Sequence, residues 1–362
     1  MLSPKTRRNI ARVIPFGVLW FIFSLIYCML EKGILGNLDH YPSTGNQYKF
    51  TINIFAIPAM GLLIGLLTGI LEIGYFSKWF IKNSFTRKII VKSLFYLAIV
   101  ILFLIITMLI NALYTYGEHS FKTLLFPALA FFTTYSVVGL MLYMASVIVI
   151  TQFYAEFSMS IGPGTLSNFF LGKYHHPVEE ERIFMFLDMK SSTTIAESLG
   201  HVKYFKMLKE YFFDLSAAVI DHSGAIYQYA GDEMIITWKL KDGLKRNRSI
   251  DCFFAMKRTL EMQAVKYNSR FGLIPDFKAG MHYGTVTAGE IGSLKKEIRF
   301  TGDVLNTSAR IQGFCNQFDA DLLVSEDLVK VLQLPSNYVI TSVGETLLKG
   351  RIKPMELYAI LI

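Results

Sequence analysis

Four long stretches without a charged side chain dominate the first 155 residues of this 362-residue chain. Each is about as long as a membrane-spanning helix requires, roughly 20 mostly apolar residues, or longer. A cleaved secretory leader has a single, shorter apolar segment, so four stretches argue for membrane helices instead. We therefore predict a four-helix transmembrane region in residues 1–155, built on Val13–Leu30, Phe50–Leu71, Ser93–Leu113 and Thr123–Ala155.

Basic side chains flank these stretches unevenly. Four precede the first stretch, and five lie between the second and third, where Glu72 is the only acidic residue. Because basic loops stay in the cytoplasm, we expect both termini on the cytoplasmic side of the plasma (inner) membrane. The net charge of +8 is then explained by topology and by contact with membrane lipid. It gives no reason to expect nucleic acid as a partner.

Residues 156–180 are predicted to form a linker that couples the membrane region to a second domain. Gly162, Pro163 and Gly164 should end the fourth helix, and His176-Pro177 should end a short helical turn that follows. From residue 181 to 362 short strands alternate with helices. This pattern predicts an α+β domain with a mainly antiparallel sheet flanked by helices.

The second domain contains recognisable strands and helices. The apolar run Ile183–Met189 predicts a buried strand, and Ile226–Trp238 predicts two strands joined by a turn at Gly231. Glycine at such a turn supplies the backbone freedom that a tight hairpin needs. Further elements are expected at Lys203–Gly224 (helix), Ser249–Gly272 (helix), Phe277–Gly284 and Thr285–Gly292 (strands), and, after a connection, a helix from about Asp303.

Two aspartates occupy positions suited to cations. Asp188 ends a predicted strand, and Ser192 and Thr193 open the helix after it, where free backbone amides favour phosphate. Asp232 lies in the hairpin turn beside Glu233, which we expect to be solvated or structural. If the two strands are neighbours, both aspartates converge beside that helix. Carboxylates would then hold Mg²⁺ or Mn²⁺ while the amides hold phosphate oxygens.

A third segment, "GDVLNTSAR", places Asn306 and Arg310 four residues apart on one face of a helix. Arginine offers a rigid fork of donors for phosphate oxygens, and asparagine can hold a ribose oxygen. Near the C-terminus, Lys349 in "LLKG" is a further candidate for phosphate contact. Alternatively, Asn306 is a local cap and Arg310 a surface residue.

Read together, these segments resemble the catalytic domain of class III nucleotidyl cyclases. The resemblance covers about Glu181 to Ile362 and rests on five motifs that occur in the family's order: "FLDMKSST", "YQYAGDEMIITW", "GMHYGTVTAGEIG", "GDVLNTSAR" and "LLKG". It implies a membrane-bound enzyme that converts ATP to 3′,5′-cyclic AMP and pyrophosphate with two Mg²⁺ or Mn²⁺ ions per site. It also implies a homodimer, because the family builds each site from two domains.

The resemblance also implies roles for individual residues. Asp188 and Asp232 would bind the two metal ions, with help from the Met189 backbone. Asn306 and Arg310 would stabilise the transition state. Lys349 would bind the terminal phosphates.

The residues expected to read the base fit neither pattern of the family. Adenylate cyclases usually have Lys paired with Asp or Thr at these positions, and guanylate cyclases usually have Glu and Cys. This chain has Gln228 and Arg299. A glutamine amide can serve adenine, or guanine when flipped, whereas an inward Arg299 would favour the O6 and N7 acceptors of guanine. We expect ATP, with GTP as the alternative, because Gln228 lacks the carboxylate suited to guanine.

Three other functions compete with this interpretation. A diguanylate cyclase would have a second glycine before the acidic pair, where this chain has Ala230. A membrane receptor with an inactive cyclase-like domain is disfavoured because the five expected metal, transition-state and phosphate residues are present. A transporter is unsupported because the four apolar stretches contain no charged residue of the kind that transport sites use.

Overall fold

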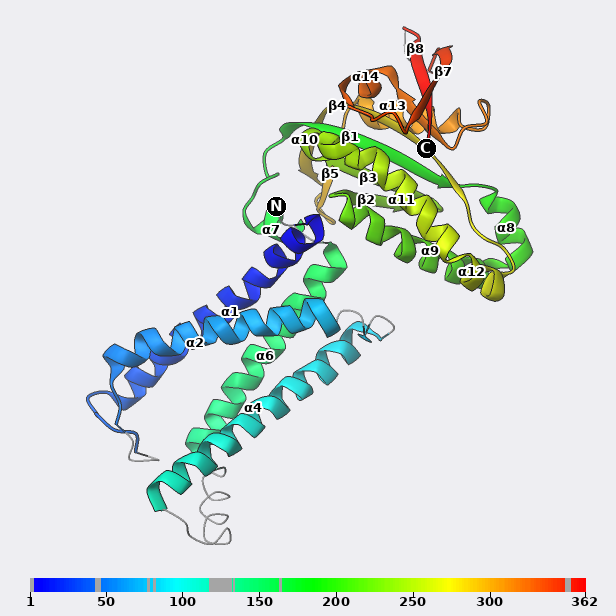
Figure 1. Cartoon of the computed structure of the whole chain (residues 1–362). Coiled ribbons are helices and arrows are strands. Elements are labelled where there is room, and N and C mark those ends of the chain that lie inside the picture. The colour runs from blue at the N-terminus through cyan, green and yellow to red at the C-terminus, as the bar shows by residue number, and fades with distance from the viewer. Residues whose placement is uncertain are drawn as a thin grey trace. The chain divides into compact units, whose positions relative to one another are not determined.

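The computed structural model describes residues 3–42, 47–76, 79–80, 83–116, 132, 134–162, 165–348 and 353–362. It contains two compact units, one of Arg7–Asn168 and one formed mainly by Phe169–Ile362. Figure 1 shows their helices and strands. Each unit is described separately below.

The first unit is a set of long apolar helices. They are α1 (Pro4–Leu35), α2 (Phe50–Leu71), which continues as the π-helical turn η1 (Glu72–Phe76), α4 (Phe85–Tyr116) and α6 (Tyr135–Ile161). Among the described residues, four helices are long and apolar enough to cross a membrane. The four spans predicted from the sequence are therefore present as helices.

The fourth helix differs from its prediction at both ends. Most of the predicted start, from Thr123, lies outside the described residues, and α6 begins at Tyr135 after the extended residue Thr134. It continues six residues beyond the apolar run, to Ile161. Gly162 ends it with a φ of +102°, a conformation that suits glycine. The first six residues of the predicted linker, 156–161, therefore belong to α6, and α7 (Thr165–Phe170) follows the break at Gly162.

The helices of this unit carry charges immediately beyond the apolar runs, and these charges meet. The ammonium of Lys92 on α4 donates to Glu72 Oε2 at 2.7 Å and to Glu156 Oε1 on α6 at 2.8 Å. The side chain of Lys92 is 0% exposed, and both carboxylates are almost as deeply buried. Lys88 lies 3.3 Å from the other oxygen of Glu156. One buried lysine therefore connects α4 to the end of α2 and to the last turns of α6.

The second unit is built on a mainly antiparallel sheet. Among the described residues eight strands are hydrogen-bonded in the order β2-β3-β1-β4-β6-β8-β7, with β5 paired to β4, and only β4 and β6 run parallel. This confirms the predicted α+β class. The strands are β1 (Val178–Met189), β2 (Ala225–Ala230), β3 (Glu233–Lys239), β4 (Phe277–Ile291), β5 (Glu297–Thr301), β6 (Leu322–Ser325), β7 (Val339–Thr346) and β8 (Met355–Leu361).

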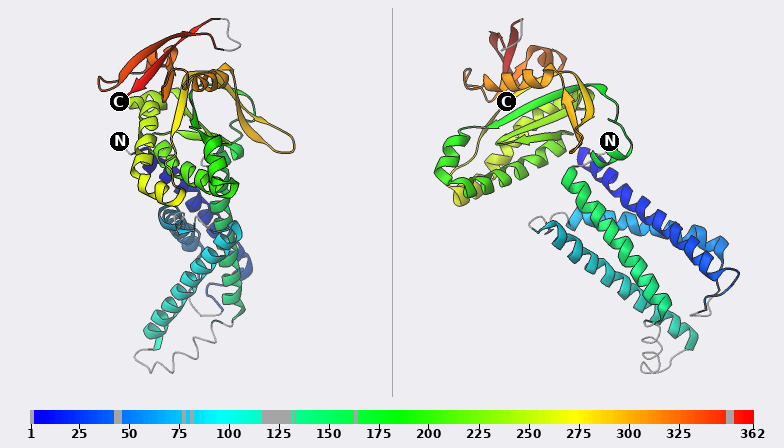
Figure 2. Two further views of the ribbon diagram at one scale, coloured as in Figure 1. Left: turned by 90° about the vertical axis from the view of Figure 1, so that its right-hand side faces the viewer. Right: turned by 180° about the vertical axis from the view of Figure 1, so that it is seen from behind.

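Helices cover both faces of the central strand β1. Helices α9 (His201–Asp221) and α11 (Arg248–Met262) lie on one face of the sheet and α13 (Asp303–Gly313) on the other (Figure 2). Met185 and Leu187 belong to the core that includes residues of α9 and α11, whereas Phe184 and Phe186 pack with Val304 of α13. A strand buried on both faces reads as a continuous apolar run, as this one does. The helices are α8 (Ser192–Leu199), α9 (His201–Asp221), α10 (Leu240–Leu244), η2 (Lys245–Asn247), α11 (Arg248–Met262), α12 (Ala264–Phe271), α13 (Asp303–Gly313) and α14 (Glu326–Val331).

Two predictions about this unit are wrong in detail. The strands expected at Phe277–Gly284 and Thr285–Gly292 form one continuous strand, β4, whose residues Phe277–Ala288 pair with β1. Gly284 is not a break in the chain: a Cβ atom there would lie 2.8 Å from the side chain of Val304 on α13, so glycine permits close helix packing. The connection after it contains β5, which forms a hairpin with β4.

The predicted helix Ser249–Gly272 is also two helices. Gln263, with φ −95° and ψ 6°, separates α11 from α12. Gly272 ends α12 in the left-handed conformation, as the sequence predicted for the end of the segment.

We expect Lys92→Met to destabilise the first unit strongly. The substitution leaves the Glu72 and Glu156 carboxylates buried without their shared cation, a loss of about 3–5 kcal/mol in the free energy of unfolding. Lys88→Met is the control, because that side chain is 20% exposed and contacts one carboxylate only, which keeps its hydrogen bond from Lys92; its expected cost is clearly smaller. Denaturant unfolding of the full chain in detergent measures both. Equal losses in the two variants would contradict the prediction.

Candidate metal and nucleotide site

Asp188 lies where the burial of β1 ends. It is the last but one residue of the strand, and its direct neighbours across the sheet are Glu233 on β3 and Lys278 on β4. The side chain is 29% exposed, whereas Phe184 and Leu187 before it are completely buried. The strand therefore presents one carboxylate at the edge of the core, between an acidic and a basic neighbour.

Asp232 is brought to the same place by the hairpin of β2 and β3. Ala230 pairs with Glu233, so the loop consists of Gly231 and Asp232 alone. Gly231 has a φ of +64°, the left-handed region that glycine occupies without strain. Because β3 is the neighbour of β1, the turn places Asp232 beside Asp188. Burial, together with the charge of Asp232, raises the pKa of Asp188, as expected for two carboxylates that share a site.

Glu233 is a third carboxylate in this group. It is partly buried rather than solvated, and burial, with Asp188 and Asp232 nearby, raises its pKa to about 7. The raised pKa values of Asp188 and Glu233, in a group of three acidic side chains, indicate a place where added positive charge is stabilised.

Two residues that the sequence did not single out hold Asp188 in place. The Gln312 amide on α13 donates to Asp188 Oδ2 at 3.1 Å, and the Lys278 ammonium lies 3.8 Å from the same oxygen. Lys278 also donates to Asn316 Oδ1 at 3.0 Å. Both of these contacts fall on the same oxygen, Oδ2. Both residues had a feature that could have identified them. Lys278 is the only Lys, Arg, Asp or Glu between Phe277 and Tyr283, and Gln312 is a polar residue on the buried face of α13.

Helix α8 begins at Ser192, as predicted, but its N-cap residue forms no side-chain cap. Ser191, in the N-cap position, has a φ of +54° and makes no side-chain cap hydrogen bond. Thr193 is exposed, and Ser192 is partly buried near Tyr204. The backbone amides at the start of α8 therefore receive no hydrogen bond from the side chain of the N-cap residue.

Asn306 and Arg310 do not meet the aspartates within one chain. The buried side of α13 consists of Val304, Thr307, Ser308, Ile311 and Gln312. Asn306 is exposed and Arg310 is partly exposed, on the opposite side of the helix. One side of α13 thus supports Asp188 while the other faces away from it. The predicted phosphate ligand Lys349 lies outside the described residues.

Met189 can contribute only its backbone to a cation. Its side chain is 2% exposed and belongs to the core on the other face of β1, next to Phe277. This placement agrees with a role for the Met189 main chain and excludes a role for its sulfur.

The two expected base-reading residues contact each other. Arg299 on β5 donates from Nη1 to Gln228 Oε1 on β2 at 2.9 Å, and its Nη2 lies 2.6 Å from Glu297. The contact with Arg299 fixes the orientation of the glutamine amide, so that its NH₂ group stays available to a ligand. Glu297 balances the charge of Arg299.

The donor set fits Mg²⁺ or Mn²⁺. No group of three or more His, Cys, Asp or Glu side chains arranged to hold a metal ion by themselves occurs in the described parts of the chain. Mg²⁺ is usually bound by one or two carboxylates, with water and substrate phosphate completing its shell. Asp188, Asp232 and a backbone carbonyl match that description.

Comparison with known proteins gives consistent results. The family model described as "Adenylate and Guanylate cyclase catalytic domain" matches residues 175–361. The chain is similar to adenylate cyclase 2 of Rhizobium meliloti, with 33% identity over 191 residues, covering 53% of this chain and 53% of that protein. It is similar to adenylate cyclase 1 of the same organism, with 28% identity over 185 residues, covering 50% and 27%.

Among solved structures, the adenylyl cyclase CyaB from P. aeruginosa has 16% identity and a TM-score of 0.46, covering 52% of this chain and 96% of that one. The chain spans about half or less of the length of the two curated relatives.

We expect Gln312→Leu to weaken Mn²⁺ binding. The substitution removes the donor that orients Asp188, and the loss of such a supporting contact typically costs about tenfold or more in metal affinity. Mn²⁺ binding to the full chain is measured by electron paramagnetic resonance of the free ion. Gln317→Leu is the control, since Gln317 is exposed in the turn after α13. Equal affinity in both variants would show that Gln312 does not position the carboxylate.

Proposed function

This chain belongs to the adenylate and guanylate cyclase catalytic domain family, and we propose that it is a membrane-bound adenylate cyclase that acts as a homodimer. It would convert ATP to 3′,5′-cyclic AMP and pyrophosphate. The observation that carries the proposal is the convergence of Asp188 and Asp232 at the end of β1, with Lys278 beside them. The four apolar helices support insertion in a membrane.

The residues divide the chemistry between them. In the reaction the ribose 3′-oxygen bonds to the α-phosphorus, the bond to pyrophosphate breaks, and the hydroxyl proton is released. Asp188, Asp232 and the Met189 backbone would hold two Mg²⁺ or Mn²⁺ ions, which supply positive charge to the hydroxyl and the leaving group. Lys278, and Lys349 as predicted, would bind terminal phosphate oxygens.

Asn306 and Arg310 would act on the substrate of a second chain. Arg310 would meet charge that develops at the α-phosphate, where fixed donors lower the barrier most. Both side chains lie on the side of α13 away from Asp188, so one chain cannot supply all the groups to one site. A head-to-tail homodimer would build two equivalent composite sites.

ATP is the favoured substrate. The two similar proteins of Rhizobium meliloti are named adenylate cyclases. Arg299 donates to one lone pair of Gln228 Oε1. The other lone pair can still accept from the adenine amino group, and the amide NH₂ can donate to adenine N1. The alternative, a guanylate cyclase, is supported by the donors of Gln228 and Arg299, which match the O6 and N7 acceptors of guanine.

We expect two inactive variants to restore activity when combined. Asp188→Ala and Arg310→Ala should each abolish formation of cyclic nucleotide from ATP with Mn²⁺. When the two are co-expressed as differently tagged chains, one composite site of the heterodimer keeps both residues, so about half of the wild-type activity per dimer should return. Activity is measured on heterodimers purified through both tags.

Three outcomes would contradict the composite site, the metal assignment or the enzymatic function, respectively. An inactive heterodimer contradicts the composite site. Full activity in the Asp188→Ala single variant contradicts the metal assignment. A wild-type chain that forms no cyclic product from ATP or GTP indicates the inactive receptor.

Base selection gives a separate prediction. Gln228→Glu places a carboxylate that accepts hydrogen bonds from the N1–H and amino group of guanine. We expect the ratio of kcat/KM for ATP to that for GTP to fall by about tenfold or more, the equivalent of 1–3 kcal/mol for a good base contact. Gln317→Glu adds the same charge on an exposed turn and should leave the ratio unchanged. An unchanged ratio in Gln228→Glu would show that this side chain does not read the base.

A further inference from the structure

The first unit contains a cavity whose charged groups are unevenly matched. It is lined by residues of α1, of the π-helical turn after α2, and of the last turns of α6. Glu72 lines it; its Oε2 accepts from the buried ammonium of Lys92, whereas its Oε1 is buried without a hydrogen-bond partner among the described residues. Glu156 takes the other bond from Lys92 and lies near Lys88. These two carboxylates and two ammonium groups therefore balance one another.

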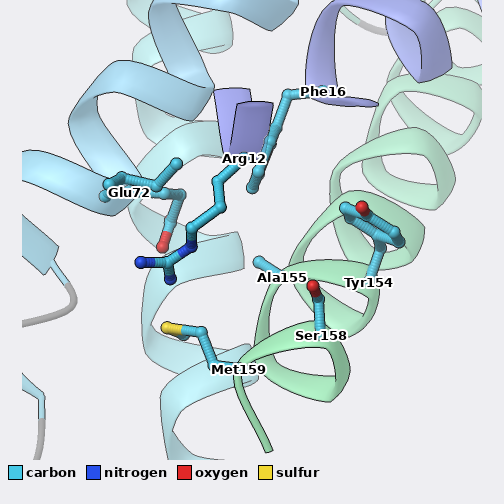
Figure 3. A pocket seen from close by; sticks show the side chains of 8 residues that line it. Arg12, Phe16, Glu72, Tyr154, Ala155, Ser158 and Met159 are labelled. Carbon is cyan, nitrogen blue, oxygen red and sulfur yellow. The ribbon is translucent and has the colours of Figure 1, made fainter. Parts of the chain in front are cut away.

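Arg12 also lines this cavity, and it takes part in none of the ion pairs among Lys88, Lys92, Glu72 and Glu156. Its guanidinium extends between Glu72 and Met159, with the Ser158 hydroxyl on the other side (Figure 3). Among the described residues no carboxylate lies within 4.0 Å of it, Glu72 included, and no hydrogen bond to it is formed. A guanidinium held partly out of water without a partner is costly, so the cavity favours a ligand that supplies negative charge.

The other lining groups narrow the chemistry of that ligand. Tyr154 and Ser158 offer hydroxyl groups beside Arg12, and Phe16, Ala155 and Met159 are apolar. A planar guanidinium fork with neighbouring hydroxyls suits phosphate oxygens. The enclosed part has room for roughly one water-sized group, so a larger ligand can insert one polar group only and must extend outward.

The position of the cavity points to the source of the phosphate. Arg12 directly precedes the first apolar run, Glu72 directly follows the second, and Glu156 directly follows the fourth. Groups at the ends of membrane-spanning runs lie at the depth of lipid headgroups. A phosphodiester that enters from this level would keep its acyl chains along the apolar helices.

We propose that this cavity is a phosphate-binding site centred on Arg12, and that its ligand is the headgroup phosphate of an anionic phospholipid. The phosphate accepts from the guanidinium and from Ser158 or Tyr154. The site lies next to Glu72, and therefore next to the ion-pair cluster that connects α2, α4 and α6.

Lipid retention by the purified full chain tests the proposal without reference to catalysis. The protein is placed in nanodiscs of phosphatidylcholine with one-fifth phosphatidylglycerol, and the lipids that remain bound are counted by native mass spectrometry. Wild type should retain phosphatidylglycerol at least fivefold over its share in the bilayer. Arg12→Gln should retain it at that share, and Arg12→Lys should fall between. Arg7→Gln, at an exposed position of the same helix, is the matched control and should behave as wild type.

Two results would overturn the proposal, and one would change the source of the ligand. Equal retention in Arg12→Gln and wild type, with unchanged thermal unfolding, shows that Arg12 holds no lipid. Loss of retention in Arg7→Gln as well shows a diffuse basic surface instead of a site. A separate experiment adds inorganic phosphate to the protein in phosphatidylcholine nanodiscs and measures thermal unfolding. If phosphate stabilises wild type but not Arg12→Gln, and the retention experiment shows no preference for phosphatidylglycerol, the ligand is free phosphate and the lipid source is overturned.

Discussion

The burial of β1 is the constraint on which the candidate active site depends. The strand is covered by α9 and α11 on one face and by α13 on the other, so its side chains must be apolar until the cover ends. Asp188 stands at that end, where one carboxylate is still partly desolvated but can reach a ligand. Its pKa is raised because water is scarce there and Asp232 is close. The same desolvation that makes the position unfavourable for a lone carboxylate makes it favourable for a divalent cation.

The two sides of helix α13 make different contacts. The buried side packs on β1 and β4 so closely that a Cβ atom on Gly280 would collide with the backbone of Gln312. This contact brings the Gln312 amide to Asp188. The other side leaves Asn306 and Arg310 free for a substrate held elsewhere. A single helix can therefore position a metal ligand in one site and donate to the phosphate of another, which is the physical basis for the proposed composite site.

In the first unit, charged side chains are buried among apolar helices. Charges buried among apolar helices are tolerated only when they are paired with good geometry, and Lys92 achieves this with two carboxylates from two other helices. Such a cluster defines the register of the helices, because a shift of any one of them would leave a charge unpaired. Arg12 stands outside the balanced set, which is why it is the group available to a ligand. Glu156, six residues before the Gly162 break, joins the last turns of α6 to this cluster.

The sequence by itself determined those features that depend on local pattern. Runs of about 20 apolar residues can form little other than spanning helices, and Ile183–Met189 predicted a buried strand. Gly231 beside Asp232 predicted the hairpin, and the order of five motifs predicted the family. These conclusions need no knowledge of which segments are neighbours, since each follows from the residues of a single segment.

The tertiary structure decided what depends on segments far apart in the chain. Lys278 and Gln312 reach Asp188 from β4 and α13, and Arg299 reaches Gln228 across 71 positions. Lys92 and Glu156 sit just outside two apolar runs and looked like ordinary flanking charges, yet helix packing buries them together. Gly284 looked like the end of a strand because sequence alone does not show that α13 packs against it. Pairing energies of this kind arise only when the fold brings the partners within a few ångströms, so no local pattern can contain them.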